Sequence, residues 1–459
     1  MMKKWMTGAL VLCGAAILGG CASAAAGIKG SGTAAGTGES GTTAEAGGSG
    51  TAGAGDSGAA GRTEVRFWYS GGKTAVKVME EAIQEFNGSQ EQYSVKGIVQ
   101  ADYDETYQKL QAGIASSTAA DLALIDADKA HSLAAKGLLE DIRPFMEEDG
   151  TFAKEDFLEV FYQQGVLEDG TLFALPAYGT TQLMYYNRAV FEKAGITPDE
   201  IKSWQDLAAV KAKLAASGQD SVFAWEPMWN ADNLIDAAFS NGASMFSADG
   251  STVTINSPEW VEAWDSFRQW IHDDNIMRIH YGGQGWEYWY ATMDDAVKGL
   301  AAGYTGSSGD QADLDFGIVG AMEQPGFGSH PSAPVARALQ LVMAGSENQA
   351  AEEGAYAFMR FFESPANQAR WSMGTGYVPV TNATLEDADY QAYTQANPHA
   401  LVPFQQASHG SILPIDPTGG KIYDALDIAA DKVEIENVPA KEALDEAQKT
   451  AQKALDAVR

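Results

Sequence analysis

The chain is poor in cysteine and in basic residues. Its 459 residues include two cysteines, and 30 Lys and Arg stand against 62 Asp and Glu, which gives a formal net charge of −32. A protein that neutralises nucleic-acid phosphates needs a basic face, so this balance argues against a nucleic-acid partner. It argues equally against binding an anionic membrane by charge, and it mainly predicts a soluble protein.

Motifs that would indicate an enzyme are also missing. Gly306–Gly309 reads Gly-Ser-Ser-Gly and is one residue short of a nucleophile elbow, and Phe67 stands where a phosphate loop before Lys73 would need glycine. The six histidines are scattered and have no nearby thiol, so no metal site of usual spacing is predicted. We therefore expect a protein that is not an enzyme and needs no cofactor. Paired carboxylates for glycoside hydrolysis stay open, because their separation is a three-dimensional quantity.

No apolar run is long enough to span a membrane. Lys3 and Lys4 precede an apolar stretch from about Trp5 to Leu18, which is shorter than the ~20 residues that a spanning helix needs. The sequence Leu-Gly-Gly-Cys then ends at Cys21 and resembles the bacterial lipobox, in which cleavage leaves the cysteine to carry diacylglycerol. We predict a signal peptide at 1–20, lipidation of Cys21, and a protein held by its lipid at the extracytoplasmic face of the bacterial cell membrane. The alternative is an ordinary secretory signal with a chance cysteine.

Residues 21–62 are predicted to form a flexible tether. They are almost wholly Gly, Ala, Ser and Thr and show no apolar periodicity. A linker of roughly 40 residues has a typical reach of about 35 Å, so it would hold a globular part clear of the lipid.

Strands and helices alternate after the tether. Strand patterns at 63–69, 93–99 and 121–125 are separated by amphipathic helical patterns. This order predicts a mostly parallel sheet with ligand groups at the carboxyl ends of its strands. Asp126 and Asp128 stand at such an end. The alternative is that both are solvated turn residues that cap the next helix.

One extended apolar run, 173–187, is predicted to be a strand that passes between two lobes. A chain of this length exceeds what one core usually serves, so two lobes are expected. Pro176 and Gly179 lie inside the run and allow the backbone to bend there.

Two helical patterns follow in the second half. Trp260, Trp264, Phe267 and Ile271 are spaced by four, three and four residues, which indicates a buried stripe on one helix. The tail from 421 to 458 reads as helical, amphipathic and acidic.

Tryptophan and tyrosine are concentrated near predicted loops and strand ends. Their faces suit the C–H faces of sugar rings, and nearby Asp, Asn, Gln and Thr suit hydroxyl groups, so together they favour a carbohydrate-like ligand. Each alone could equally be a core residue. The aromatic residues concerned are Trp68, Tyr69, Tyr103, Tyr107, Tyr178, Trp225, Trp229, Trp286, Tyr304 and Tyr377.

The order and spacing of several short segments carry a family resemblance. These segments are Phe67-Trp68, Phe86-Asn87, Leu110–Ala115, Gly137–Ile142, Leu175-Pro176, Tyr185–Asn187, Ala194-Gly195, Ser203–Leu207 and Thr375–Thr381. With them in this order, the chain resembles, from Glu64 to Asp456, the family 1 extracellular solute-binding proteins of ABC importers.

The resemblance implies an α/β protein with the two-lobed, type II-like periplasmic-binding-protein fold. Each lobe would be a mostly parallel sheet flanked by helices, with the ligand in a cleft between lobes and crossing segments near Ala177, Gly320 and Tyr377. The implied lobes are 63–177 plus 321–377 and 178–320 plus 378–459. The resemblance further implies a monomer that captures a sugar or sugar derivative and delivers it to the transmembrane subunits of an ABC permease. The alternatives are a surface glycan-active hydrolase and a sensory sugar-binding module.

Matching the glycerophosphate-binding member of this family indicates ligand-facing positions and two departures. Ala336-Arg337 replaces a pair of glycines, and the expected basic residue is absent from 408–411. Arg337 could supply the positive charge from the other side of the cleft, or it could pair structurally with Asp126 or Asp128. The match places Tyr107, Thr180, Trp229, Tyr304 and Tyr377 at or beside the ligand. The full predicted ligand set is Trp68, Tyr69, Tyr107, Asp126, Asp128, Tyr178, Thr180, Trp229, Trp286, Tyr304, Arg337 and Tyr377.

Overall fold

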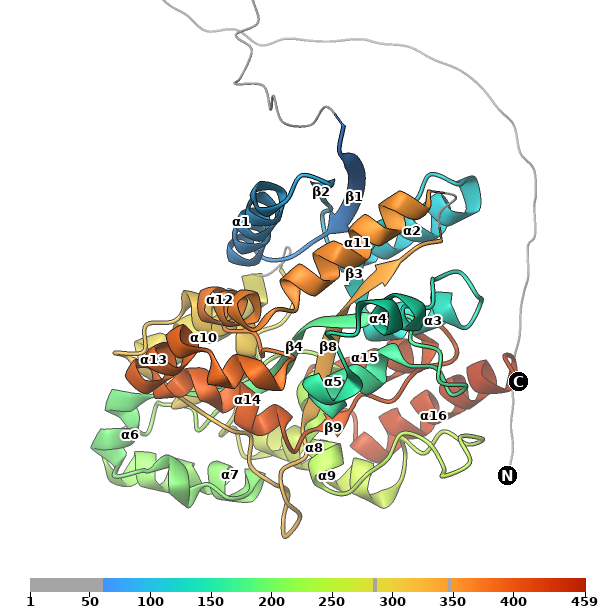
Figure 1. Cartoon of the computed structure of the whole chain (residues 1–459). Helices are drawn as coiled ribbons and strands as arrows, with labels where there is room; N and C mark the ends of the chain where they lie inside the picture. The colour runs from blue at the N-terminus through green and yellow to red at the C-terminus, as the bar shows by residue number, and fades with distance from the viewer. Residues whose placement is uncertain (1–60, 284–286, 346–347) are drawn as a thin grey trace, which may run out of the picture. The chain divides into compact units, whose positions relative to one another are not determined.

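Strands and helices alternate along the first half of the chain, and helices dominate the last third (Figure 1). In the computed structural model the strands are β1 (Thr63–Tyr69), β2 (Tyr93–Val99), β3 (Leu122–Asp126), β4 (Leu175–Asn187), β5 (Glu226–Pro227), β6 (Gly303–Ser307), β7 (Val319–Met322), β8 (Val335–Met343) and β9 (Ser411–Ile412). The helices are α1 (Lys73–Ser89), α2 (Tyr103–Ser116), α3 (Ala127–Ala134), α4 (Arg143–Asp149), α5 (Glu159–Tyr162), α6 (Arg188–Ala194), α7 (Trp204–Ala216), α8 (Ala231–Ser240), α9 (Pro258–Arg268), α10 (Glu287–Lys298), α11 (Gln349–Phe362), α12 (Pro365–Thr375), α13 (Ala388–Ala396), α14 (Val402–Ala407), α15 (Lys421–Glu434) and α16 (Ala440–Asp456).

The structure describes residues 61–283, 287–345 and 348–459, which belong to one compact unit, Ser57–Arg459. The predicted signal peptide 1–20, Cys21, nearly all of the tether and Trp286 lie outside the described residues. Among the described residues, no helix combines the length and the apolar character needed to cross a membrane.

One sheet path, β2-β1-β3-β8-β4-β6-β5, runs through the protein, with β7 added to β4 and β9 added to β8. The predicted parallel pairing is found between β1 and β2, β1 and β3, and β5 and β6. The sheet as a whole is mixed rather than mostly parallel, because β8 runs antiparallel to β3 and β4, and β4 runs antiparallel to β6 and β7. Parallel neighbours need a crossover connection, whereas β8 and β4 are long strands that enter the sheet from another part of the protein.

The predicted crossing strand 173–187 is confirmed as β4. Its first half pairs with β8, and its second half pairs with β6 and β7. The backbone irregularity expected near Pro176 is a β-bulge between Pro176 and Tyr178. Tyr178 packs in one hydrophobic core and Met184 in another, so a single strand contributes to both.

Two large cores organise the two halves. The first gathers side chains from β1, β3, β8, α1 and α11, and the second gathers those from α6 to α9, α15 and α16. Phe327 and Val335, which the expected boundaries place in lobe 1, pack in the second core. Val378 and Val380, expected in lobe 2, pack in the first. The chain changes core inside β8, where Val335 and its neighbour Ala336 pack in different cores.

The helices of the second core follow the predicted apolar stripes. Trp260, Trp264 and Phe267 are fully buried on α9, as their spacing predicts. Ile271, the fourth residue of the predicted stripe, is only partly buried and lies in the π-helical turn Gln269–Asp273 that follows α9. The predicted helical tail 421–458 is two helices, because Pro439 precedes α16 and its ring disfavours a continuous helix. The helices α15 and α16 lie side by side and pack against α9 (Figure 1).

Candidate ligand cleft

Two adjoining pockets form the candidate site. The first, of about 370 Å³, is lined by Trp229, Asn230, Asp232, Tyr288, Asp427 and Asp431. The second, of about 300 Å³, is bounded by residues of β3, α3 and β8 on one side and of α8 and α15 on the other. Asp232 and Asp427 line both pockets, so the two lie next to each other. We call them together the acidic cleft.

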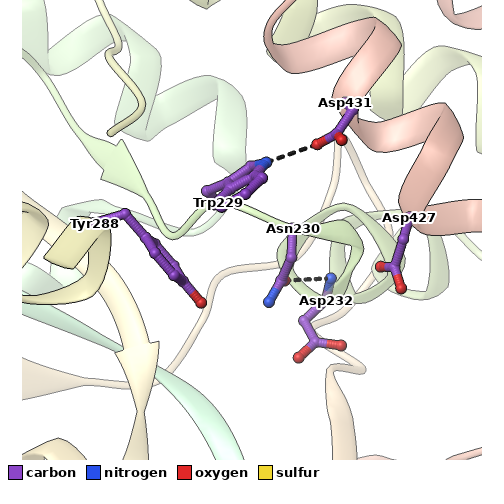
Figure 2. A pocket seen from close by; sticks show the side chains of 6 residues that line it. All are labelled: Trp229, Asn230, Asp232, Tyr288, Asp427 and Asp431. Carbon is purple, nitrogen blue, oxygen red and sulfur yellow. Dashed lines mark hydrogen bonds between the residues drawn. The ribbon is translucent and has the colours of Figure 1, made fainter. Parts of the chain in front are cut away.

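The first pocket is built where α8 begins against α15 (Figure 2). Asn230 has a φ of 132°, and its side-chain oxygen accepts from the backbone N–H of Asp232 at 2.9 Å, which caps α8. Asp427 and Asp431 are four residues apart and therefore share one face of α15. The indole Nε1 of Trp229 donates to Oδ1 of Asp431 at 2.7 Å. The rings of Trp229 and Tyr288 meet edge to face, with centroids 4.9 Å apart.

The second pocket joins the two halves of the protein through charged groups. Asp126 at the end of β3 lies 3.2 Å from Nζ of Lys129, which also pairs with Asp104. Arg337 on β8 donates to Oδ1 of Asp232 at the start of α8. The predicted structural pairing of Arg337 with Asp126 or Asp128 is therefore corrected to Asp232, because Arg337 projects toward α8 from a strand that borders both cores. Burial alone would lower the pKa of Arg337, but the nearby Asp232 carboxylate raises it by a larger amount. The pKa therefore lies above its usual value, and Arg337 stays charged.

Carboxylates outnumber cations in the acidic cleft. Five aspartates line it, at 126, 128, 232, 427 and 431, against Lys129 and Arg337, so the ionised groups sum to −3. The pKa of Asp128 is raised mainly by burial and additionally by the negative charge of the neighbouring Asp126. Although the Asp427 side chain is exposed, partial desolvation by the surrounding protein raises its pKa to about 6, and the Asp232 carboxylate adds to this rise. The site suits hydrogen-bond donors and positive charge better than anions.

A third pocket of about 220 Å³ contains the predicted residue Tyr377. It is lined by the start of α1, from Gly72 to Ala75, and by Tyr290, Asp313 and Thr375 among others. Burial raises the pKa of Tyr377 to about 12, so its hydroxyl remains a neutral donor. The start of α1 borders this pocket, and backbone N–H groups at the start of a helix can donate to a ligand.

Several predicted ligand residues lie in cores instead of lining these pockets. Tyr178 is fully buried, shares a hydrogen bond of 2.8 Å with the Tyr103 hydroxyl and packs on Tyr377. Tyr304 is fully buried and donates to Asp310 at 3.1 Å. Tyr69 is buried and stacks on Phe67 of the same strand.

The remaining predicted residues are dispersed. Trp68 and Tyr107 pack against a small core that includes side chains of β3 and β8. The Thr180 hydroxyl lies 3.3 Å from the hydroxyls of Ser307 and Ser308. The structure thus brings together Asp126, Asp128 and Arg337 in one pocket, with Trp229 in the pocket that adjoins it. Contact of each predicted residue with ligand stays a prediction.

The sequence did not predict the residues that α8, α10, α15 and the residue before α8 contribute to the cleft. Tyr423 lines the second pocket, and the others missed are Asn230, Asp232, Tyr288, Asp427 and Asp431. Two signals could have found part of this set. The first is that Asp427 and Asp431 stand four residues apart in a tail predicted to be helical and acidic. The second is that Asp232, in the first turn of α8, comes three residues after the predicted ligand residue Trp229.

One group of side chains outside these pockets has metal-compatible spacing among the described residues. Single donor atoms of Glu226, His280 and Asp295 lie within 4.8 Å of one another. Arg278 already pairs with both carboxylates, and Nε2 of His280 lies 2.8 Å from Oδ2 of Asp295. A cation would have to displace the guanidinium, so the arrangement works as an ion-pair network that ties β5 to α10.

Comparisons with known proteins agree with this architecture. A family model for bacterial extracellular solute-binding proteins matches residues 81–398. The sn-glycerol-3-phosphate-binding periplasmic protein UgpB of Agrobacterium fabrum is 26% identical over 366 residues, which cover 76% of this chain and 81% of that protein. UgpB of Mycobacterium tuberculosis in complex with glycerophosphocholine has a TM-score of 0.74 at 22% identity, covering 86% of this chain and 99% of that one. The Listeria monocytogenes substrate-binding protein Lmo0181 in complex with cycloalternan has a TM-score of 0.73 at 20% identity, with coverages of 86% and 99%. These structures share the two-lobed fold.

Proposed function

Because the chain belongs to the bacterial extracellular solute-binding protein family, we propose that it captures a sugar or sugar derivative and delivers it to an ABC importer. The acidic cleft is the proposed binding site. In this proposal the protein performs no chemistry on the solute, and its partners are the transmembrane subunits of the permease.

The observation that carries this proposal is the composition of the acidic cleft. It has an aromatic wall, Trp229 with Tyr288, next to side chains that can accept hydrogen bonds from hydroxyl groups. Aromatic faces and convergent polar groups are the usual means of holding a polyhydroxylated ring. The cleft also draws residues from both cores, so a solute bound there would be touched from both halves.

The solute would enter and leave the cleft as the two halves of the protein open and close about the crossing strands. A ligand that contacts both halves favours the closed arrangement by its differential affinity for the two states. The closed, loaded form would be the one that docks on the permease.

Calorimetric titration with neutral, cationic and phosphorylated sugars, together with glycerol 3-phosphate, tests the binding function. We expect at least one to bind and to raise the unfolding temperature, since a ligand at 100 times its Kd adds ~2.7 kcal/mol of stability. Turnover of a bound sugar, seen as new products by chromatography, would contradict a pure binding role. Binding by no member of the panel would count against the function itself.

We further propose that the mature protein is anchored through lipid on Cys21 and reaches outward on the 21–62 tether. Cys21→Ala should abolish incorporation of radiolabelled fatty acid into the protein while leaving solute binding unchanged. Equal labelling of wild type and variant would rule out this anchor.

A further inference from the structure

Resting on the proposed function of the acidic cleft, we propose that its solute is an amino sugar, a polyhydroxylated ring that carries a protonated amine, rather than a phosphorylated sugar. The carrying observation is that every cation lining the cleft already has an internal partner, whereas several carboxylates do not. The amine would sit among those carboxylates.

Both cations that line the cleft are already compensated. Arg337 is paired with Asp232, and Lys129 is paired with Asp104 and Asp126. A phosphate entering the cleft would have to take one of these cations from its carboxylate. That exchange leaves an aspartate uncompensated beside the new dianion, which is unfavourable.

Three carboxylates remain without a cation. Asp128, Asp427 and Asp431 form no ion pair in the parts of the chain that the structure describes. The side chain of Asp431 accepts only the neutral N–H of Trp229 there. A protonated amine is the simplest partner for such a group, because it supplies both the missing charge and several N–H donors.

A buried acid on the same helix face supports this placement independently. Glu434 lies three residues after Asp431 and seven after Asp427, so it shares their face of α15. It is 2% exposed, and neither carboxyl oxygen has a hydrogen-bond partner of normal geometry in the described residues. Burial raises the pKa of Glu434, and the backbone N–H of Asn230 opposes that rise. Glu434 therefore extends the acid-rich face of α15 to the backbone of Asn230, a residue that lines the first pocket, although Glu434 itself does not line it.

The aromatic wall accounts for the ring of the proposed solute. Figure 2 shows the Tyr288 side chain directed toward Asn230 and Asp232, with Trp229 above them and Asp427 and Asp431 beyond. A sugar ring placed against Trp229 would set its substituents among these carboxylates. Aromatic rings also attract cations through their faces, so the wall and the carboxylates favour the same charge.

Titration calorimetry with chemically matched sugars tests the proposal. Glucosamine and its β-1,4-linked dimer would be compared near neutral pH with their N-acetylated counterparts, which have lost the charge, and with glucose 6-phosphate. We expect an amino sugar to bind at least about tenfold more tightly than its acetylated match, an advantage that added salt reduces. Glucose 6-phosphate should give no measurable heat.

Two isosteric variants locate the effect. Asp427→Asn and Asp128→Asn should each reduce the ratio of the affinity for the amino sugar to the affinity for its acetylated match. The control is Asp199→Asn, which changes an exposed acid in the short 3-10 helix Pro198–Glu200 after α6 and should leave the preference unchanged. Circular dichroism would verify that all three fold.

The outcomes separate this inference from the proposed function. Equal affinity for the amino and acetylated sugars, or preference for glucose 6-phosphate, overturns the inference and leaves sugar capture intact. Binding by none of the probes overturns the amino-sugar inference, and only failure of the wider solute panel as well would also remove the sugar-capture function.

Discussion

Arg337 and Asp232 form an ion pair that links β8 to the first turn of α8. Their side chains are 25% and 31% exposed, so the pair is largely shielded from water. Ala336, next to Arg337, packs in the first core, whereas Ala231, next to Asp232, packs in the second. This pair is therefore a direct electrostatic connection between the two halves, at the edge of the acidic cleft.

Removing either partner of this pair should destabilise the protein. Arg337→Met leaves Asp232 without its cation, and Asp232→Asn leaves Arg337 without its anion, so we expect each to cost about 1 to 3 kcal/mol of unfolding free energy. The double variant should cost less than the sum of the two. Urea denaturation of the four proteins gives the coupling energy, and strictly additive losses would mean that the pair contributes nothing.

Trp229 should contribute strongly to affinity through its ring. Trp229→Ala should weaken binding of the best sugar in the panel by about thirtyfold, because a buried aromatic wall contributes on the order of 2 kcal/mol. Trp229→Phe keeps an aromatic face but loses part of its area and the N–H that donates to Asp431, so its loss of binding free energy should be nearer about 1 kcal/mol.

The control for Trp229 is Ile428→Ala on α15, whose side chain is 61% exposed. Calorimetry should give the same affinity for this variant as for wild type. An unchanged affinity for Trp229→Ala would place the ligand elsewhere.

Gly179 in β4 should not tolerate a side chain. A Cβ there would lie 2.1 Å from Cζ of Phe161, whose ring is fully buried, while Gly179 exchanges two backbone hydrogen bonds with Val378. Because neither the ring nor the backbone can move freely, Gly179→Ala should cost about 1 to 3 kcal/mol.

Gly88 provides the matched control for that substitution. It lies near the end of α1 with nothing within 4 Å of an added Cβ. Gly88→Ala should leave stability unchanged or raise it by about 0.5 kcal/mol, since alanine loses less backbone entropy in a helix. Equal unfolding midpoints for both alanine variants in urea would refute the steric argument at Gly179.

Asp310 should make stability fall as the pH rises. Burial raises its pKa to about 8, although Tyr304 and Trp289 donate hydrogen bonds to it. An unfolded aspartate has a pKa of about 3.9, so between about pH 4 and pH 8 the native state holds a proton that the unfolded chain has released. The free energy of unfolding therefore decreases through this window, by at most ~1.4 kcal/mol per pH unit from this group, and levels off above it.

Asp310→Asn removes that titration and should flatten the profile. Burial likewise raises the pKa values of Asp236 and Glu226 to about 7, so the variant keeps part of the decrease. Urea midpoints from about pH 5.5 to pH 8.5 measure the difference. Parallel profiles for the two proteins would show that Asp310 is ionised throughout.

Local patterns were sufficient to predict much of the fold. The spacing of Trp260, Trp264 and Phe267 identified a buried helix face, because a period near 3.6 places them on one stripe. The apolar run around Pro176 identified the crossing strand, and the segment order gave the family that the comparisons support. These signals come from residues close together in sequence or from the order of segments along the chain. They can therefore be recognised without knowing which helices and strands pack against one another.

The site was harder to predict because it depends on which helices and strands pack against one another in the folded protein. Tyr178 and Tyr304 look like candidate ligand contacts near strand ends, yet both are fully buried, since alternation along a strand does not say which face another layer covers. Asp427 and Asp431 become cleft residues only because α15 packs beside α8, nearly two hundred residues away in sequence. No local pattern specifies that meeting.

The packing of α15 and α16 has a consequence for the order of folding. Ile422 to Leu455 complete the second core, and α15 supplies one side of the acidic cleft. Before these helices are synthesised, the second core has uncovered apolar surface, so this half of the protein cannot finish folding until residues 421–456 have joined it. Proteolytic removal of these residues would therefore unfold the second half rather than trim it.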